Sequence, residues 1–477
     1  MGDLVRRFAP SQKLVVAVVY VCGMLLNSID STVVNVALAT LAREFEVPAE
    51  SMEAIVIAYL ISVAVFIPVS GWVGDRWGTK KTFLAALALF TIASALCGLS
   101  QNIGQMVVFR VLQGAGGGLL TPVGMAMLYR AYPPAERVGV SRILMWATTL
   151  GPALGPIIGG LLIEHLSWRW IFYVNIPVGI AAIAFGWAFL AEHREPKAGR
   201  FDAIGFVLAG TGLGALMYAL TEGPNVGWTS PRILGLGIAG IVLLVGFTLT
   251  EMRVAEPMVN LRLLSNRLFR STLFVSMFTA SAFMGTLFLM PLFLQEGRGV
   301  SPLTSGLATF PEAVGVVLST QIVARLYPRV GPSRLMATGL TFVALVALVM
   351  SSLSGDSSLW LIRGLMFLLG FGVAYVFLPN QAASMATISS EDMGRASTLF
   401  SVQRQIGGAI GIAILSTILR ITGDGEISIG DTSDFKVAFW GAACLGLIGA
   451  FFALRVPDRE AAATMRPRRI VAEAHAD

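Results

Sequence analysis

Residues 109–122 read FRVLQGAGGGLLTP, an apolar and glycine-rich stretch that carries a single charged residue, Arg110. The apolar segment around it, 104–128, exceeds the roughly 20 residues that an α-helix needs to cross the hydrocarbon core of a bilayer. Glycine weakens a helix in water, but in a membrane helix it lets a neighbouring helix approach closely. The stretch therefore predicts a membrane-spanning helix.

The rest of the chain follows the same pattern. Hydrophobic residues make up 55% of the 477 residues and charged residues only 13%, about half the share found in a soluble domain. The mean hydropathy is +0.76. We count fourteen apolar segments of spanning length, the first at 14–38 and the last at 436–455. The sequence predicts an all-α polytopic membrane protein with 14 transmembrane helices.

The positive charge indicates how the chain is oriented. Most of the 34 Lys and Arg residues lie in alternate loops and in the two terminal segments, which is the positive-inside pattern. We expect a multi-pass protein of the cytoplasmic membrane with both termini in the cytoplasm. The net charge of +6 thus reflects topology, and no nucleic-acid partner is expected.

A weak internal repeat divides the chain. Residues 362–379, IRGLMFLLGFGVAYVFLP, repeat the order of arginine, glycines and proline found at 109–122. We therefore expect an N-terminal six-helix bundle at 14–192 and a C-terminal six-helix bundle at 265–456. Two inserted helices occupy 200–255, and a disordered cytoplasmic tail follows at 457–477.

Four further motifs carry chemistry or packing information. Residues 26–38, LNSIDSTVVNVAL, place Asp30 in an apolar helix. Residues 71–81, GWVGDRWGTKK, form a basic loop with an acid, called the latch loop below. Residues 150–160, LGPALGPIIGG, repeat glycine every four positions, which favours close helix packing. Residues 168–177, WRWIFYVNIP, indicate an aromatic helix start at the membrane interface, to which we assign no chemistry.

Asp30 is a candidate proton carrier. An ionised carboxylate inside a membrane costs at least about 2.5 kcal/mol, so burial favours its protonated form. The alternative is a structural acid that is hydrogen-bonded to its neighbours, Ser28, Ser31, Thr32 or Asn35.

Together these motifs resemble the fourteen-helix drug:proton antiporters of the major facilitator superfamily, whose two six-helix halves enclose a site near the bilayer midplane. The resemblance implies that Asp30 and Arg110 take part in proton coupling. Helices 1 and 4 both line the cavity in this architecture, so we expect Arg110 to pair with Asp30. The alternative is a purely structural ion pair. Gln113 lies one turn from Arg110 and shares its face.

The resemblance also assigns the latch loop and the fifth helix. The latch loop would close the cytoplasmic side, with Asp75 facing the N-terminus of the helix that begins near Ala396. Its other matching residues are Gly71, Arg76, Gly78 and Lys80. The glycine pattern of helix 5 is typical of exporters and would face helix 10 at the interface of the halves; its residues are Gly151, Pro152, Gly155, Pro156 and Gly159.

A second embedded acid lies in the tenth segment. Glu312 follows Pro311, and an acid at a proline-broken helix is a candidate proton or cation site; a structural acid is the equal alternative. The predicted substrate contacts are Asn35, Gln113 and Glu312. The predicted proton-coupling residues are Asp30, Arg110 and Glu312.

These features predict a proton-coupled antiporter that exports small lipophilic compounds, cationic ones included, as a monomer. The alternative is an exporter of one endogenous metabolite, antibiotic, peptide or lipid. Nutrient uptake is disfavoured by the glycine pattern of helix 5. The sequence contains no motif for a metal, a cofactor, a nucleotide or enzymatic catalysis.

Overall fold

The computed structural model describes residues 11–195, 199–254, 257–422 and 432–465. These residues form helices and connecting turns, with no strand among them. The first part of the chain forms α2 (Gln12–Glu44), α3 (Glu53–Trp77), α4 (Thr79–Leu99), α5 (Ile103–Ala131), α6 (Arg137–His165), α7 (Trp170–Tyr173) and α8 (Asn175–Phe189). The remaining helices are α9 (Ala203–Val226), α10 (Pro231–Arg253), α11 (Arg267–Leu292), α12 (Pro302–Thr309), α13 (Pro311–Val330), α14 (Pro332–Met350), α15 (Leu359–Ser384), α16 (Met393–Thr422), α17 (Ser433–Ala453) and α18 (Ala462–Met465).

Thirteen helices within the described residues are long and apolar enough to cross a membrane. The prediction of an all-helical polytopic protein is confirmed. The remaining predicted segment, 138–162, falls within α6, a helix of 29 residues. A count of fourteen spans therefore stays a prediction.

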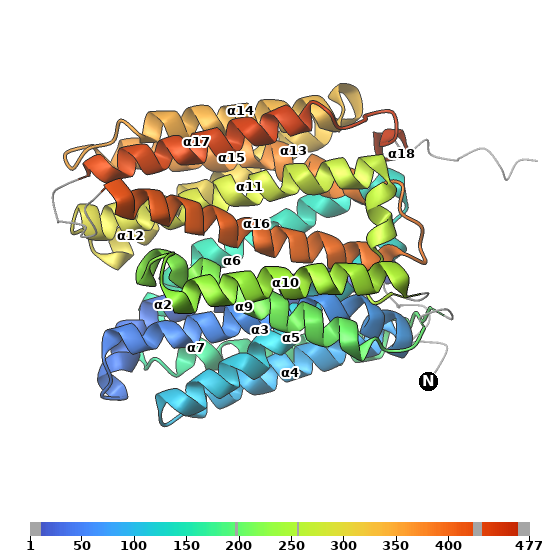
Figure 1. Ribbon diagram of the computed structural model, residues 1–477, viewed down its shortest axis with the longest axis horizontal. Coiled ribbons are helices and arrows are strands. Elements are labelled where there is room, and N and C mark those ends of the chain that lie inside the picture. Colours follow the sequence, from blue (N-terminus) through green and yellow to red (C-terminus); the bar gives the residue numbers. More distant parts are fainter. Residues whose placement is uncertain (1–10, 196–198, 255–256, 423–431, 466–477) are drawn as a thin grey trace, which may run out of the picture.

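The two halves of the chain form two layers that lie side by side. In Figure 1, α2 to α5 and α7 lie in the lower layer and α11 to α17 in the upper one, while α6 lies at the boundary between them. Across the boundary, α16 packs on α3 and α5, while α6 packs on α13 and α15. The first described residues and α18 lie at the same end of the molecule (Figure 1), as an even number of crossings requires.

Equivalent turns support the internal repeat. Gly78 separates α3 from α4 with φ +103°, and Gly331 separates α13 from α14 with φ +87°. Only glycine adopts such backbone angles freely. In each half, the helix that follows this glycine receives a cap from a distant carboxylate. The carboxylate lies in the chain after the last helix of that half, α8 or α17, and accepts a hydrogen bond from a backbone N–H in the first turn of α4 or α14. Glu192 accepts from the Lys80 N–H at 2.9 Å, and Asp458 accepts from the Ser333 N–H at 2.7 Å.

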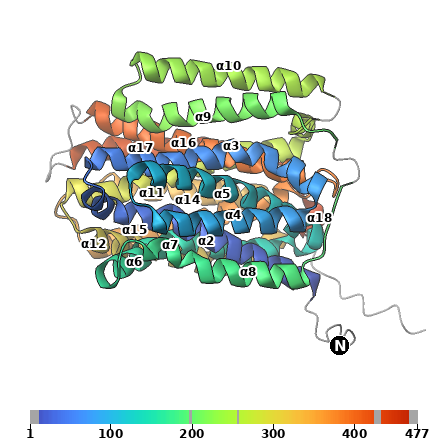
Figure 2. The same ribbon diagram turned by 90° about the horizontal axis from the view of Figure 1, so that it is seen from below.

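The inserted helices bridge both halves. Figure 2 shows α10 as the outermost helix, with α9 between it and the rest of the bundle. A Cβ added at Gly210 of α9 would lie 3.2 Å from Val65 of α3. The loop after α9 reaches α16 instead, where the Trp228 indole N–H donates to Thr417 at 2.8 Å. The hairpin thus contacts α3 in one half and α16 in the other.

The beginning of the predicted tail is folded. Residues 457–465 include α18, where Thr464 is buried and its hydroxyl lies 2.7 Å from that of Tyr327 in α13. Prediction of a disordered tail over 457–477 was wrong for this part, because charged residues such as Asp458 serve as helix caps. The rest of the tail lies outside the described residues.

Candidate functional site

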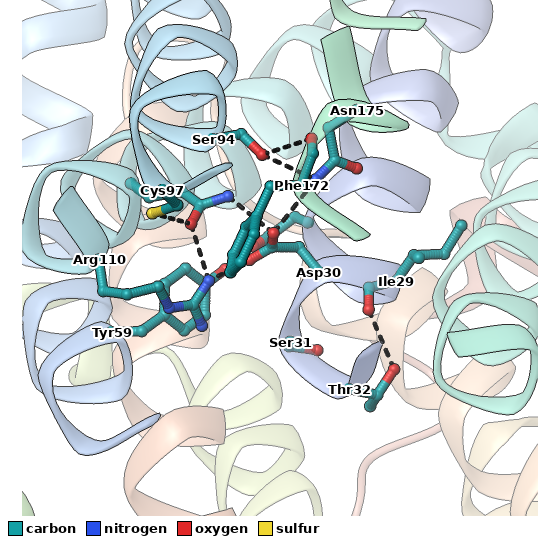
Figure 3. A network of polar contacts seen from close by, with 12 residues as sticks. Ile29, Asp30, Ser31, Thr32, Tyr59, Ser94, Cys97, Arg110, Phe172 and Asn175 are labelled. Carbon is teal, nitrogen blue, oxygen red and sulfur yellow. Dashed lines mark hydrogen bonds and ion pairs between the residues drawn. The ribbon is translucent and has the colours of Figure 1, made fainter. Parts of the chain in front are cut away.

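Asp30 and Arg110 form a buried ion pair between α2 and α5 (Figure 3). The Arg110 Nη1 donates to Asp30 Oδ2 at 2.6 Å, and the side chains are 1% and 0% exposed. Gln113, one turn along α5, donates its Nε2 to Asp30 Oδ1 at 2.7 Å. Its own Oε1 accepts from Arg110 Nη1 at 2.7 Å. The expected pairing of Asp30 with Arg110 is thus present, and Gln113, predicted as a substrate contact, joins them; the roles of all three stay predictions.

The sequence interpretation missed the fourth member of this site. Asn175, the first residue of α8, donates its Nδ2 to Asp30 Oδ1 at 3.2 Å and to Ser94 Oγ at 3.0 Å. It lies in the aromatic motif 168–177, to which no chemistry was assigned. Its polar amide in the apolar part of that motif, after Arg169, was the available signal. We call Asp30, Arg110, Gln113 and Asn175 the Asp30 cluster.

The surroundings of the Asp30 cluster hold Arg110 in place. Its guanidinium carbon lies 4.1 Å from the centre of the Tyr59 ring, a cation–π contact. The Tyr59 hydroxyl donates to Asn27 on α2. A Cβ added at Gly114 would lie 2.7 Å from the Tyr59 carbonyl oxygen, so glycine is what lets α5 approach α3 here. The glycines after Arg110 thus serve the packing around the ion pair.

This arrangement stabilises Asp30 as an ionised carboxylate. Asp30 accepts hydrogen bonds on both oxygens and faces one cation, so its ionised form is satisfied without water. A proton bound at Oδ2 would replace the bond from Arg110 and leave the guanidinium without its counter-charge. The charge on Asp30 therefore contributes to the link between α2 and α5.

The other two predicted substrate residues lie elsewhere. Asn35 is an exposed residue of α2 and takes no part in the hydrogen bonds of the Asp30 cluster. Glu312 lies at the start of α13, is 5% exposed, and has an Oε1 without a hydrogen-bond partner among the described residues. The helix is interrupted there, since α12 ends at Thr309. Gly370 of α15 packs against the backbone of Glu312. Both assignments stay predictions.

The latch loop is helical except at Gly78, since its residues 71–77 end α3 and its residues 79–81 begin α4, and its α3 part contacts the start of α16. A Cβ added at Gly394 would lie 2.8 Å from both carboxylate oxygens of Asp75, so glycine leaves room for this acid at the helix start. Gly71 packs against Gly394 and Thr398 in the same way, and a 3.1 Å hydrogen bond joins Ser70 to Thr398. The geometry places Asp75 where the resemblance implied, beside the first turn of α16.

Two partners of the latch loop were not foreseen. Arg130, at the end of α5, donates to Asp75 Oδ1 at 2.8 Å and to the Ser390 carbonyl at 3.0 Å, so it joins both halves. Glu192 accepts from Lys80, whose Nζ also donates to the Trp187 carbonyl at 2.8 Å. Arg76 is exposed.

His193, in the loop after α8, lies close to this charged region. Its carbonyl accepts from the Thr79 N–H at 2.9 Å. Partial burial, followed by the charge of Arg130, lowers the pKa of its imidazole below the ordinary 6.5.

The fifth predicted membrane helix is α6 in the structure. Its glycine face packs on a different helix from the one expected. A Cβ at Gly151 would lie 2.5 Å from Ser28, and one at Gly159 would lie 2.8 Å from Val33. Gly155 faces Thr32 at closer range still. The partner is therefore α2, in the same half, and the expected pairing with helix 10 was wrong for this face. Small residues define a flat surface but do not determine which helix occupies it.

α6 does contact α13, which belongs to the tenth predicted membrane helix, through another surface. The Arg142 guanidinium of α6 donates to Gln321 of α13 at 3.1 Å. Pro152, half-buried, lies in α6 between the first two of these glycines, and the side chain of Pro156 lies outside the described residues. No group of three or more His, Cys, Asp or Glu side chains placed to hold a metal occurs in the described part of the chain.

Comparison with known proteins agrees with this geometry. The family model described as Major Facilitator Superfamily matches residues 20–412. The chain is 31% identical over 405 residues to a "Multidrug resistance protein B homolog" of Mycobacterium tuberculosis, covering 84% of this chain and 75% of the relative. It is 31% identical to the "Tetracenomycin C resistance and export protein" of Streptomyces glaucescens, covering 95% and 83%.

A "Putative multidrug resistance protein MdtD" of Salmonella paratyphi B is also 31% identical, covering 91% of this chain and 93% of the relative. Solved structures share the fold. The human organic anion transporter MFSD10 superposes with a TM-score of 0.67 at 17% identity, covering 92% of this chain and 99% of that one. The proton:xylose symporter XylE gives 0.66 at 14% identity, covering 95% and 98%. The chain belongs to the major facilitator superfamily and, within it, to the drug:proton antiporters.

Proposed function

We propose that this protein is a proton-coupled antiporter that exports small lipophilic drugs or toxic compounds, cationic ones included, across the cytoplasmic membrane. The observation that carries the proposal is the Asp30 cluster, a desolvated ion pair with amide donors in the N-terminal half. Multidrug-resistance proteins among the relatives support drugs as the substrate class. The protein acts as a monomer, with both termini in the cytoplasm.

Proton arrival at Asp30 starts the transport cycle. An ionised acid and an arginine at this depth are stable only while they remain paired. When Asp30 is neutralised, Arg110 must find another partner or water, and the α2–α5 contact rearranges. Release of the proton from Asp30 into the cytoplasm restores the ion pair with Arg110. In this way the proton gradient drives the halves between two arrangements.

The latch loop controls when the transporter opens toward the cytoplasm. Contacts of Asp75 and Ser70 with the first turns of α16 hold α3 of one half against the other half. Arg130 adds a bond to Ser390 across the same boundary. We place this end on the cytoplasmic side, from the distribution of Lys and Arg. The arrangement described here would then be closed to the cytoplasm.

A second candidate is the export of one defined compound. The tetracenomycin C resistance and export protein matches 95% of this chain, which favours a self-made antibiotic as a substrate. Both candidates use the same proton site, so they differ only in the range of compounds that drive proton movement.

The test is proton movement in liposomes with an imposed proton gradient. Ethidium, a lipophilic cation, is added while internal pH is recorded for the parent protein, Asp30→Asn and Glu312→Gln. Glu44→Gln is a matched control, because it removes an exposed acid from the same helix as Asp30.

We expect the parent and Glu44→Gln to move protons in response to ethidium, and Asp30→Asn to move none while remaining folded. Loss of only the cation response in Glu312→Gln would assign recognition to α13. Normal proton movement by Asp30→Asn would disprove the coupling role of that acid. If no cation moves protons but tetracenomycin C does, the export of one defined compound is the correct function.

A further inference from the structure

An apolar groove lies on the outer surface between α14 and α17. These two helices run side by side along one edge of the molecule (Figure 1), far from the Asp30 cluster in the other half. The groove has a volume of about 600 Å³. It is lined by Ala337, Thr338, Thr341, Phe342, Leu345, Ala450, Phe451 and Leu454.

The groove follows from the sizes of the residues along the helix contact. A Cβ added at Gly446 would lie only 3.2 Å from the Cβ of Ala344, so the helix backbones are close on the inner side. On the outer side, Ala337 and Ala450 form a buried floor at 7% and 6% exposure, too small to fill the space. Phe451, more than half exposed, forms part of a wall. The result is an open apolar groove on the surface that would face the hydrocarbon of the bilayer.

Two arginines lie at one end of this groove. Arg455 directly follows the lining residue Leu454, and its guanidinium carbon lies 3.9 Å from the centre of the Phe451 ring. Arg334 precedes Thr338 by one helical turn on the same exposed face of α14. Neither guanidinium forms an ion pair within the described residues. Asp458 accepts instead from the Ser333 N–H.

The position of these arginines along the bilayer is fixed by the helix ends. The start of α14 and the end of α17 meet where Ser333 Oγ donates to the Ala453 carbonyl at 2.9 Å. This end of the molecule also carries α18 and the first described residues (Figure 1). It is the end that the positive-inside pattern predicts to face the cytoplasm. The arginines therefore lie at headgroup level of the inner leaflet.

We propose that the groove binds an anionic phospholipid, with one acyl chain along the groove between α14 and α17 and the phosphate between Arg334 and Arg455. Apolar walls match an acyl chain, and two unpaired guanidinium groups match a phosphate. The same positive charge disfavours a cationic drug. The groove faces away from the boundary between the halves, so it is distinct from the transport site.

The test compares lipids that differ only in headgroup charge. Purified protein is incubated in mixed micelles with phosphatidylglycerol or phosphatidylcholine of equal chain length, and bound lipid is counted by native mass spectrometry. The variants are Arg334→Ala/Arg455→Ala, its charge-retaining form Arg334→Lys/Arg455→Lys, and Thr341→Trp, which fills the groove. Arg253→Ala is the matched control, since Arg253 is an exposed arginine at the end of α10, away from the groove.

We expect the parent to retain phosphatidylglycerol over phosphatidylcholine. The double alanine variant should bind about 25-fold more weakly, about fivefold for each arginine removed, whereas the lysine form and Arg253→Ala should bind as the parent does. Thr341→Trp should lose the lipid although both arginines remain, because the acyl chain no longer fits.

Equal retention of the two lipids by the parent would overturn the proposal. So would unchanged binding in the double alanine variant or in Thr341→Trp. A protein dimer that forms without lipid and is lost in Thr341→Trp would assign the groove to a second copy of the chain instead. All substituted residues are exposed, so a folding defect does not obscure these outcomes.

Discussion

Two ion pairs that involve α2 differ in burial and allow a direct test of what the Asp30 cluster contributes. Asp30 and Arg110 are 0% and 1% exposed, with 2.6 Å between the bonded atoms. Glu44 and Arg169 are 48% and 35% exposed and lie 3.3 Å apart. Water can solvate each member of the second pair if its partner is lost, but not the members of the first.

The expected losses of stability follow from that difference. Asp30→Asn leaves the guanidinium of Arg110 buried without an opposite charge, which costs about 3–5 kcal/mol of unfolding free energy. Glu44→Gln should cost at most about 1 kcal/mol, because exposed pairs contribute little. The double variant Asp30→Asn/Arg110→Leu removes both buried charges and should recover most of the loss of the single variant.

Unfolding of the purified proteins in detergent, followed by circular dichroism during a denaturant titration, measures these differences. Coupled proton movement in liposomes should be absent from both Asp30 variants, including the more stable double variant. This separates the coupling role from folding. If Asp30→Asn were as stable as the parent, or the double variant no more stable than Asp30→Asn, the buried ion pair would not have the energetics argued here.

Three further predictions concern packing, the latch and pH. Gly155→Ala should lower the unfolding free energy by about 1–3 kcal/mol, because the added carbon meets α2. Gly160→Ala, which meets nothing within 4 Å, should not; equal losses would contradict the packing argument. Asp75→Asn should shift the equilibrium toward opening at the latch end by up to about thirtyfold, because a charge placed favourably at a helix start is worth up to about 2 kcal/mol. Spin-label distances across that end measure the shift, and the exposed Arg76→Gln should leave them unchanged. Because the folded state lowers the pKa of His193, it favours the neutral imidazole. Stability should therefore fall as pH drops below about 6.5 toward the lowered pKa. His193→Gln should abolish this slope in unfolding titrations; an identical slope would assign the pH dependence to another group.

The buried ion pair was predictable because membranes permit few solutions for a charge. An acid and an arginine in separate apolar segments must each find a partner, so Asp30 and Arg110 were natural candidates for each other. Gln113 followed from helical periodicity. Asn175 was not found, because an asparagine at a helix start is equally consistent with a simple turn or cap. Only the packing of α8 beside α2 and α4 brings its amide to Asp30.

Long-range pairings show the same division. Glycines at Gly151, Gly155 and Gly159 predicted a close helix contact, and the contact exists. Its partner was wrongly expected to be helix 10, because a flat face has no preference that a single sequence displays. Asp75 was placed beside the correct helix by resemblance. Arg130 and Glu192, which complete the latch, lie far from it in sequence and gave no local signal.

The sequence by itself determined the all-helical class, and it predicts the repeat that relates the two halves and the side of the membrane that its basic loops favour. These properties depend on local hydrophobicity, charge and periodicity, which each short segment carries alone. The tertiary structure decided which helix meets each small-residue face, which amides surround Asp30, and that the inserted hairpin contacts both halves. Those contacts depend on the shapes of surfaces distant in sequence, and the bilayer provides no hydrophobic force that would select among them.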